Sequence, residues 1–208
     1  MFVKPINGGL FDSVSYIVGN GKEAILIDAG VPGDKVLAAE KELNTSIKKI
    51  ILTHGHIDHL LHADDIVQKT NAMAYIHIDD EQAITDARVN ISAFTGKATT
   101  LRSKYEVLRD GNSIKVGELD FKIIHTPGHS AGSICIQVEN LLFSGDTLFK
   151  YGYGRVDLPN GNFSDIYNSI VEKLFVLPGE TIVYPGHGES TTIIDEIRIN
   201  PIKNAVQW

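Results

Sequence analysis

The sequence contains a single cysteine, Cys135, so no disulfide can form within the chain. Small secreted domains stapled by disulfides need an even set of cysteines, and that class is therefore excluded. Apolar runs such as 50–52 are far shorter than the roughly twenty residues that span a bilayer. Residues 1–11 hold proline, asparagine and two glycines where a signal peptide would have an unbroken apolar stretch. We expect a cytoplasmic protein with no membrane segment.

Positive charge is also scarce in this chain. Nineteen lysines and arginines stand against 26 acidic residues, which gives a formal net charge of −7, and no basic run interrupts that balance. Nucleic-acid binding requires a basic face that neutralises phosphates, so we expect no nucleic-acid partner. By contrast, 43% hydrophobic residues over 208 positions are ample for a packed core. We predict one domain across residues 1–208 and no disordered architecture.

Strand-like and helix-like segments alternate along the chain. Strands are expected at 14–18, 24–27, 49–52, 74–78, 113–116, 121–124, 133–138, 141–143 and 181–184. Helices are expected at 32–43, 58–68, 79–87, 164–175 and 192–199. Between 89 and 108 the pattern weakens, which predicts a long irregular crossover. Strands and helices mixed through both halves suggest two sheets covered outside by helices.

The segment His54-Gly55-His56-Ile57-Asp58-His59 places four metal-capable side chains in six residues, where a predicted strand leads into a predicted helix. Alternation along an extended segment brings His54 and His56 to the same side. Asp58 and His59, in the first helical turn, can turn toward a neighbouring position. One segment can therefore serve two ions.

Three more potential ligands follow predicted strands. His129 and His187 each end a Pro-Gly-His turn, and Asp146 follows Ser144-Gly145. Together with the first segment these residues supply five imidazoles and two carboxylates, enough for two ions that each keep an open position. Open positions are typical of catalytic sites rather than closed structural ones. Imidazole with carboxylate suits zinc, iron or manganese, and we expect two divalent ions with zinc first.

In combination these motifs resemble the metallo-β-lactamase superfamily. Asp28 in the segment Leu26-Ile-Asp-Ala-Gly30, the segment 54–59, His129, Asp146 and His187 are similar to the five successive motifs of that superfamily. The resemblance implies an α/β fold, a four-layer αββα sandwich with the metals at one edge. It assigns one ion to His54, His56 and His129, the other to Asp58, His59 and His187, and a bridging role to Asp146. Asp28 would brace the ligand loop.

Within the superfamily, the stretch 144–149 and Gly154-Arg155 resemble the glyoxalase II group, which hydrolyses thioesters such as hydroxyacylglutathione. The resemblance implies a small-molecule thioester substrate, attack by a metal-bound hydroxide whose proton Asp58 would hold, and a substrate contact from Arg155. This chain departs from the glyoxalase II pattern in two features that concern binding of the thiol. The chain ends soon after Pro201, without the helical C-terminal domain of the long glyoxalases, and Glu189 replaces the family's tyrosine. An acidic group there would repel an anionic thiol, so glutathione does not follow.

Other functions of the same fold remain open. Persulfide dioxygenases share the stretch Gly154-Arg-Val-Asp157 and use one iron, which His54, His129 and Asp146 would hold here. The Pro-Gly-His-Gly sequence at 185–188 favours the hydrolase. Lactonase and phosphodiesterase activities are further alternatives, as is a non-catalytic binding module. A bridging Asp146 argues against the true β-lactamases.

Several residues have an ordinary structural interpretation. Arg155 can clamp a substrate or pair with Asp157, two residues away. We expect His62, His77 and His125 to be structural or solvated side chains, and Cys135 to be a buried, inert thiol. The sequence indicates no particular oligomeric state.

Overall fold

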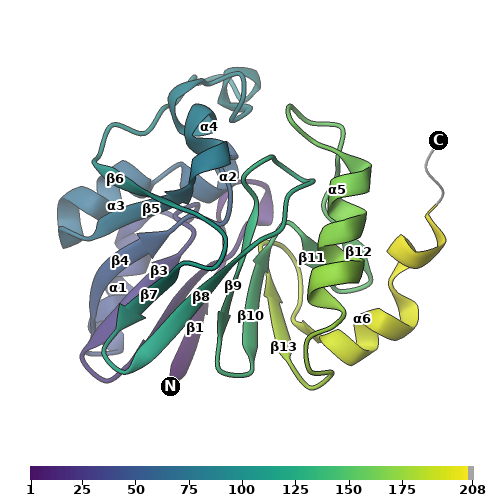
Figure 1. Cartoon of the computed structure of the whole chain (residues 1–208). Helices are drawn as coiled ribbons and strands as arrows, with labels where there is room; N and C mark the ends of the chain where they lie inside the picture. The colour runs from purple at the N-terminus through teal and green to yellow at the C-terminus, as the bar shows by residue number, and fades with distance from the viewer. Residues whose placement is uncertain (206–208) are drawn as a thin grey trace.

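The computed structural model describes residues 1–205 and contains two β-sheets with helices on their outer faces (Figure 1). The first sheet has six strands in the order β1-β2-β3-β4-β5-β6. Its strands β1 to β3 run antiparallel and β3 to β6 run parallel. These strands are β1 (Phe2–Ile6), β2 (Ser15–Asn20), β3 (Glu23–Ile27), β4 (Ser46–Ile51), β5 (Met73–His77) and β6 (Tyr105–Leu108).

The second sheet also has six strands, in the order β14-β13-β10-β9-β8-β7. Only the pair β10 and β13 runs parallel, and all the other neighbours are antiparallel. The strands are β7 (Ser113–Val116), β8 (Leu119–His125), β9 (Ile134–Val138), β10 (Leu141–Gly145), β13 (Ile182–Pro185) and β14 (Thr191–Thr192). A small hairpin, β11 (Leu148–Phe149) with β12 (Gly152–Tyr153), follows β10.

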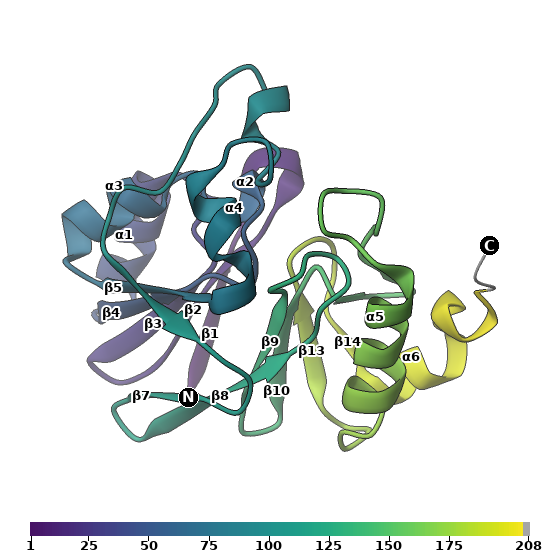
Figure 2. The same cartoon turned by 45° about the horizontal axis from the view of Figure 1, so that its top comes forward.

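Helices form the two outer layers (Figures 1 and 2). The first sheet carries α1 (Gly33–Glu42) and α3 (Ala63–Thr70). The second carries α5 (Phe163–Asn168), its π-helical continuation Ser169–Leu174, and α6 (Ile193–Ile199). The short helices α2 (Ile57–Leu60) and α4 (Glu81–Thr85) lie at the upper edge in Figure 1. The predicted four-layer αββα sandwich is confirmed; of the predicted domain 1–208, residues 206–208 lie outside the described residues.

Alternation along the central strands buries both faces of the first sheet. Leu26 of β3 packs beneath α1 and α3, whereas its neighbours Ile25 and Ile27 point toward the second sheet and join a cluster with Phe121 and Phe143. A strand buried on both faces is apolar at every position, which is why 24–27 has no polar alternation. A third cluster seals the second sheet against α5 and α6. The rigid sandwich leaves the strand ends to carry the polar residues.

The single helix predicted at 58–68 is wrong, because the structure divides it into α2 and α3. The backbone near the break bonds to the loop after β3 instead of continuing the helix. Ala29 N donates to the carbonyl of His59 at 2.7 Å, and His62 N donates to the carbonyl of Ala29 at 2.9 Å. Tertiary hydrogen bonds thus override the helical spacing of the apolar residues.

Two edge strands of the first sheet differ from the sequence prediction. The irregular crossover predicted at 89–108 holds β6, which pairs in parallel with β5, and β1 was not predicted at all. Both lie at the edges of the first sheet. Edge strands are half-exposed, as Val107 is at 40%, so they lack the apolar runs that identify central strands.

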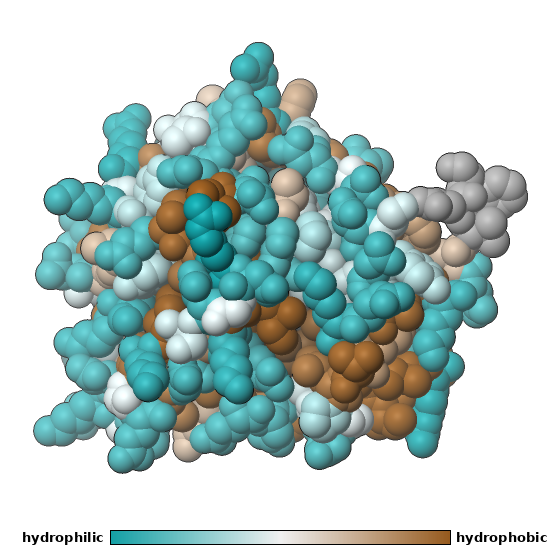
Figure 3. Space-filling model, in the orientation of Figure 1, coloured by the Kyte–Doolittle hydropathy of each residue, from teal (hydrophilic) through white to brown (hydrophobic). Residues whose placement is uncertain are grey.

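The molecular surface in the orientation of Figure 1 is largely hydrophilic, with apolar side chains gathered near the lower end of α5 (Figure 3). Val176, just beyond the π-helical continuation, is 72% exposed. Within residues 1–205, no helix combines the length and the apolar character needed to cross a membrane.

Candidate metal centre

The seven predicted ligands lie at one edge of the sandwich, each beyond the end of a strand. The segment 54–59 follows β4 in the first sheet, while His129 follows β8, Asp146 follows β10 and His187 follows β13 in the second. Segments far apart in the sequence thus meet at the same strand ends. Loops held by rigid strands can fix side chains more precisely than free loops can.

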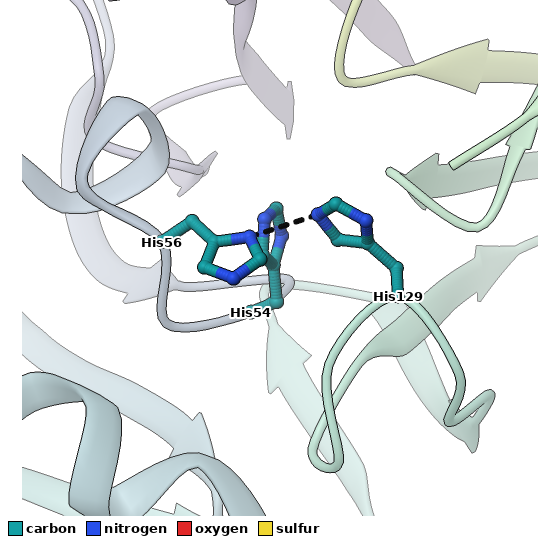
Figure 4. Close-up of side chains that lie close together, drawn as sticks. All are labelled: His54, His56 and His129. Atoms are coloured by element: carbon teal, nitrogen blue, oxygen red, sulfur yellow. Dashed lines mark hydrogen bonds between the residues drawn. The ribbon is translucent and has the colours of Figure 1, made fainter. Parts of the chain in front are cut away.

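His54, His56 and His129 form the first group (Figure 4). His56 Nδ1 lies 2.8 Å from His129 Nε2. The ring of His54 is 4.8 Å, centroid to centroid, from each of the other two rings. Ligands around an ion at bond lengths of about 2.0–2.1 Å are themselves roughly 2.9–3.4 Å apart. These three buried imidazoles are therefore close enough to share one ion.

Asp58, His59 and His187 form the second group. His187 Nε2 lies 3.1 Å from Asp58 Oδ2 and 3.2 Å from His59 Nε2. The distance from His59 Nε2 to Asp58 Oδ2 is 3.4 Å. These separations also match those expected around a common ion.

Asp146 faces both groups. Its Oδ1 lies 3.3 Å from His59 Nε2, and its Oδ2 lies 3.6 Å from His129 Nε2 and 3.6 Å from His187 Nε2. One oxygen thus points toward the second group while the other lies between the two. This is the position that a bridging carboxylate would need.

Hydrogen bonds on the far side of the rings orient the ligands. Asp28 Oδ2 lies 2.8 Å from His59 Nδ1, and Asp28 Oδ1 accepts from Thr53 N at 2.7 Å. Thr53 Oγ1 in turn lies 3.1 Å from His54 Nδ1. With the Nδ1 atoms occupied, the Nε2 atoms of His54 and His59 are left to face the centre. Asp28 thus contacts the ligand loop, as the resemblance implied.

Two imidazoles of the first group and the two ligand carboxylates have the charge states that suit a bound cation. Burial lowers the pKa of His54 well below its usual value, and burial together with the charge of His129 lowers the pKa of His56 to about 3. Burial acts to raise the pKa values of Asp58 and Asp146, but the neighbouring charge of His59 outweighs it and lowers both. Neutral imidazoles and ionised carboxylates are the forms that bind metals. Despite burial, the neighbouring carboxylates raise the pKa values of His59 and His187, so an ion in the second group would displace the protons of these two rings.

Two unpaired buried atoms show that the residues fit metal ions. Within residues 1–205, His54 Nε2 and Asp146 Oδ1 are buried without a hydrogen-bond partner. A buried polar atom left unsatisfied costs about 1–3 kcal/mol. Both atoms face the ligand groups, so a cation there would satisfy them. Imidazole nitrogen and carboxylate oxygen suit divalent zinc, iron or manganese.

Asp80, which the sequence analysis missed, holds two ligand loops together. It is 2% exposed and accepts hydrogen bonds from Gly55 N at 2.8 Å, Ser130 Oγ at 2.7 Å and Gly132 N at 2.6 Å. Gly55 lies between two ligands, and Ser130 follows His129. In the sequence, Asp80 looked like an ordinary acidic residue at a helix start, and no local signal distinguishes it.

Gly186 leaves room for the second ligand group. A Cβ atom at this position would lie 2.3 Å from Asp146 Oδ1 and 2.6 Å from His59 Cε1. The backbone before His187 therefore approaches the ligands as closely as only glycine permits. The Pro-Gly-His turn is thus required for packing as well as for chain direction.

A cavity of about 480 Å³ opens onto the ligands. Its floor includes His56, Asp58, His129, Asp146 and His187. Its remaining wall is mostly apolar, with one cationic residue, and consists of Phe11, Ile91, Phe149, Tyr153, Leu158 and Arg155. Such a cavity is large enough for a small organic substrate.

The two charged residues that the sequence analysis connected with the substrate, Arg155 and Glu189, are both paired. Arg155 Nε and Nη2 each lie 2.6 Å from a carboxylate oxygen of Asp157. Glu189, expected to repel an anionic thiol, is bonded to Lys150 Nζ at 2.6 Å. Both pairs are exposed, so each can exchange partners at small cost.

Two further residues, Cys135 and His62, can be compared with the sequence prediction. Cys135 is buried in β9, and burial raises the pKa of its thiol to about 11, as expected of an inert thiol. His62 is half-buried at the break between α2 and α3.

Sequence comparison relates the chain to known families. The model of the Metallo-beta-lactamase superfamily matches residues 8–187. A probable metallo-hydrolase, YqgX of Bacillus subtilis, is 32% identical over 94% of this chain and 94% of its own length. The hydroxyacylglutathione hydrolase GloC of Haemophilus influenzae is 32% identical over 92% of each chain.

Solved structures agree over nearly the whole chain. The BLEG-1 B3 metallo-beta-lactamase superposes with a TM-score of 0.92 at 33% identity, covering 98% of this chain and all of the other (100%). A di-iron-bound form of TTHA1623 superposes with a TM-score of 0.85 at 31% identity, covering 96% of this chain and 99% of the other.

Proposed function

The chain belongs to the metallo-beta-lactamase superfamily, and from this we propose that it hydrolyses thioesters of small molecules. It is a metallo-hydrolase of that superfamily. One observation carries the proposal: both ligand groups face Asp146 at the floor of the apolar-walled cavity. The 32% identity to a hydroxyacylglutathione hydrolase supports a thioester as the substrate.

Two groups of ligands would hold the two ions. His54, His56 and His129 would hold one ion, Asp58, His59 and His187 the other, and Asp146 would contact both. Two divalent ions, with zinc as the first expectation, would supply Lewis-acid activation of water and of the acyl carbonyl. Asp58 lines the cavity and is ionised, so its carboxylate can accept a hydrogen bond from the attacking water and hold its proton.

The cavity wall suits the two halves of a thioester. Phe11, Ile91 and Phe149 offer apolar surface to an acyl chain. The leaving thiol is already acidic, with a pKa of about 8.5, so no strong general acid is needed to expel it. Arg155 can contact an anionic leaving group once it exchanges Asp157 for the substrate.

The decisive experiment pairs metal analysis with a substrate panel. Protein purified without added metal is analysed for metal per chain, and thioesters that differ in acyl chain and thiol are assayed under nitrogen. We expect two ions and thioester turnover. Asp58→Ala should lose turnover, whereas Asp120→Asn, on the exposed side of β8, should retain it. About one iron, no hydrolysis and oxygen uptake with a persulfide would replace the proposal with a dioxygenase.

A second candidate is β-lactam hydrolysis, favoured by the close superposition with the BLEG-1 B3 metallo-beta-lactamase. At the level of sequence, the bridging carboxylate expected from Asp146 argued against β-lactam hydrolysis. A chromogenic β-lactam and a simple lactone in the same panel separate these activities. Turnover of the β-lactam at a kcat/KM above that of every thioester would reverse the assignment.

A further inference from the structure

Two apolar residues of the cavity wall have a backbone conformation that side chains rarely adopt. Phe11 has φ 55° and ψ 29°, and Ile91 has φ 64° and ψ 0°, both in the left-handed region. Bulky and β-branched residues are especially unfavourable there. Of the nine described residues other than glycine at positive φ, six are asparagine, aspartate or glutamate, and Tyr151 carries a hydroxyl. The two apolar exceptions both line the cavity.

The backbone alone does not explain why these two positions hold large apolar side chains. Asparagine adopts the left-handed region readily, and Asn71, at φ 57° and ψ 24°, does so just after α3. Strained residues persist where the surrounding structure fixes them, and such residues cluster at functional sites. We therefore connect the side chains of Phe11 and Ile91 with what the cavity binds.

The loop that carries Phe11 is fixed to the second ligand group. Ser13 Oγ donates to the carbonyl of Asp58 at 2.7 Å. Val14 N donates to the carbonyl of Gly186 at 2.9 Å. These bonds hold the phenyl ring beside the ligands although its residue is 59% exposed.

Ile91 and Phe149 are placed near the same group. Ile57 N, inside the ligand segment, donates to the carbonyl of Asn90 at 2.9 Å, and Ile91 is the next residue. The ring of Phe149 lies 6.2 Å, centroid to centroid, from that of His187. Three apolar side chains of the wall are thus connected with the second ligand group.

Arg155 is connected with the first ligand group instead. Its carbonyl oxygen lies 2.8 Å from His129 Nδ1, and its residue also lines the cavity. A thioester whose carbonyl lies over the ligands extends from them in two directions. A polar or anionic thiol is favoured beside a guanidinium, so the acyl chain would face the apolar side chains.

We infer that Phe11, Ile91 and Phe149 determine acyl specificity, and that they select aliphatic acyl groups of medium length, such as hexanoyl, over acetyl and lactoyl. The inference rests on the proposed thioester hydrolysis, in which water adds to the acyl carbon, the carbon–sulfur bond breaks, and a carboxylic acid and a thiol are released. Each methylene removed from water favours binding about fourfold. Phenyl and aliphatic side chains offer a hydroxyl no hydrogen bond.

The test compares acyl chains on one neutral thiol. The acetyl, butanoyl, hexanoyl and lactoyl thioesters of N-acetylcysteamine are assayed with the metal-loaded protein. Phe11→Asn and Ile91→Asn remove apolar surface and suit the left-handed backbone. Phe94→Asn, on the same loop as Ile91 but 78% exposed, is the matched control. Calorimetry with the same proteins measures the binding of acetate and hexanoate, which share a head group.

In wild type and control we expect kcat/KM to rise roughly tenfold or more from acetyl to hexanoyl, and hexanoate to bind more tightly than acetate by a similar factor. Each site variant should lose most of both differences. The unfolding temperature of Phe11→Asn should equal or exceed that of wild type, because asparagine relieves the backbone strain. That result would separate a loss of specificity from a loss of folding.

The outcomes distinguish the specificity from the reaction. Hydrolysis that does not depend on acyl length, or an equal loss of selectivity in Phe94→Asn, overturns the inference while thioester hydrolysis stands. If no thioester is hydrolysed but hexanoate binds more tightly than acetate, and Phe11→Asn and Ile91→Asn lose this difference, the reaction is wrong and the apolar site stands. No hydrolysis and equal binding of the two acids overturn both.

Discussion

Replacing Asp80 by asparagine tests whether one buried carboxylate holds the ligand loops in place. Asp80 Oδ2 accepts from Gly55 N and Ser130 Oγ, and Oδ1 accepts from Gly132 N. Asparagine has the same shape but a single acceptor oxygen. If that oxygen replaces Oδ1, the new NH₂ group faces Gly55 N; if it replaces Oδ2, the NH₂ group faces Gly132 N. In either orientation two donors meet.

The size of the effect follows from that mismatch. A buried donor without an acceptor costs about 1–3 kcal/mol, so we expect the free energy of unfolding to fall by about 2 kcal/mol. For a domain of this length, such a loss lowers the unfolding temperature by roughly 4–8 °C. The loops that carry His54, His56 and His129 are also released from one another, so metal affinity should fall.

Urea denaturation of the metal-free proteins measures the change in stability, and competition with a chromophoric chelator measures metal affinity. Asp120→Asn controls for the loss of a negative charge, because Asp120 is exposed on β8. If Asp80→Asn unfolds at the same urea concentration as wild type and binds metal with the same affinity, Asp80 does not hold the loops together.

Four further predictions follow from other residues. Gly186→Ala should weaken metal binding at least tenfold in chelator competition, because its methyl group would overlap Asp146 and His59; unchanged affinity would contradict the close approach. Chelation should lower the unfolding temperature by roughly 8–16 °C for an ion present at a thousand times its Kd, and added metal should restore it in calorimetry. Arg155→Gln should raise KM for thioesters of anionic thiols more than for neutral ones, with kcat little changed; equal effects on both in steady-state kinetics would remove Arg155 from the substrate site. The folded-state pKa of His77, about 4, lies below its ordinary value of 6.5, so stability is lost as pH falls through that window, and His77→Gln should lose less in acid titrations followed by urea unfolding.

The sequence predicted the sandwich, and it singled out seven residues that the structure brings together, because both depend on strong local patterns. Buried central strands such as β3 are continuous apolar runs, and the segment 54–59 places four potential ligands within six residues. The edge strands β1 and β6 have no such pattern, since one side of each lacks a neighbour.

Other features arise only from contacts distant in the sequence. The helix break at His62 depends on hydrogen bonds to Ala29, and the role of Asp80 depends on loops 25 and 52 residues away. The apolar wall of the cavity brings Phe11 and Ile91 to the metal centre from unrelated loops. Neither residue has a local signature, because loop positions are set by tertiary packing.

Each ligand group takes residues from both sheets: the segment 54–59 extends from the first, while His129 and His187 extend from the second. An ion bound to either group would therefore cross-link the two halves of the sandwich. The sheets could then separate only after the ion dissociates, so the rate of unfolding would be governed by metal release rather than by the apolar interface alone. The protein's lifetime in the presence of proteases would thus be set by the ion supply of its surroundings.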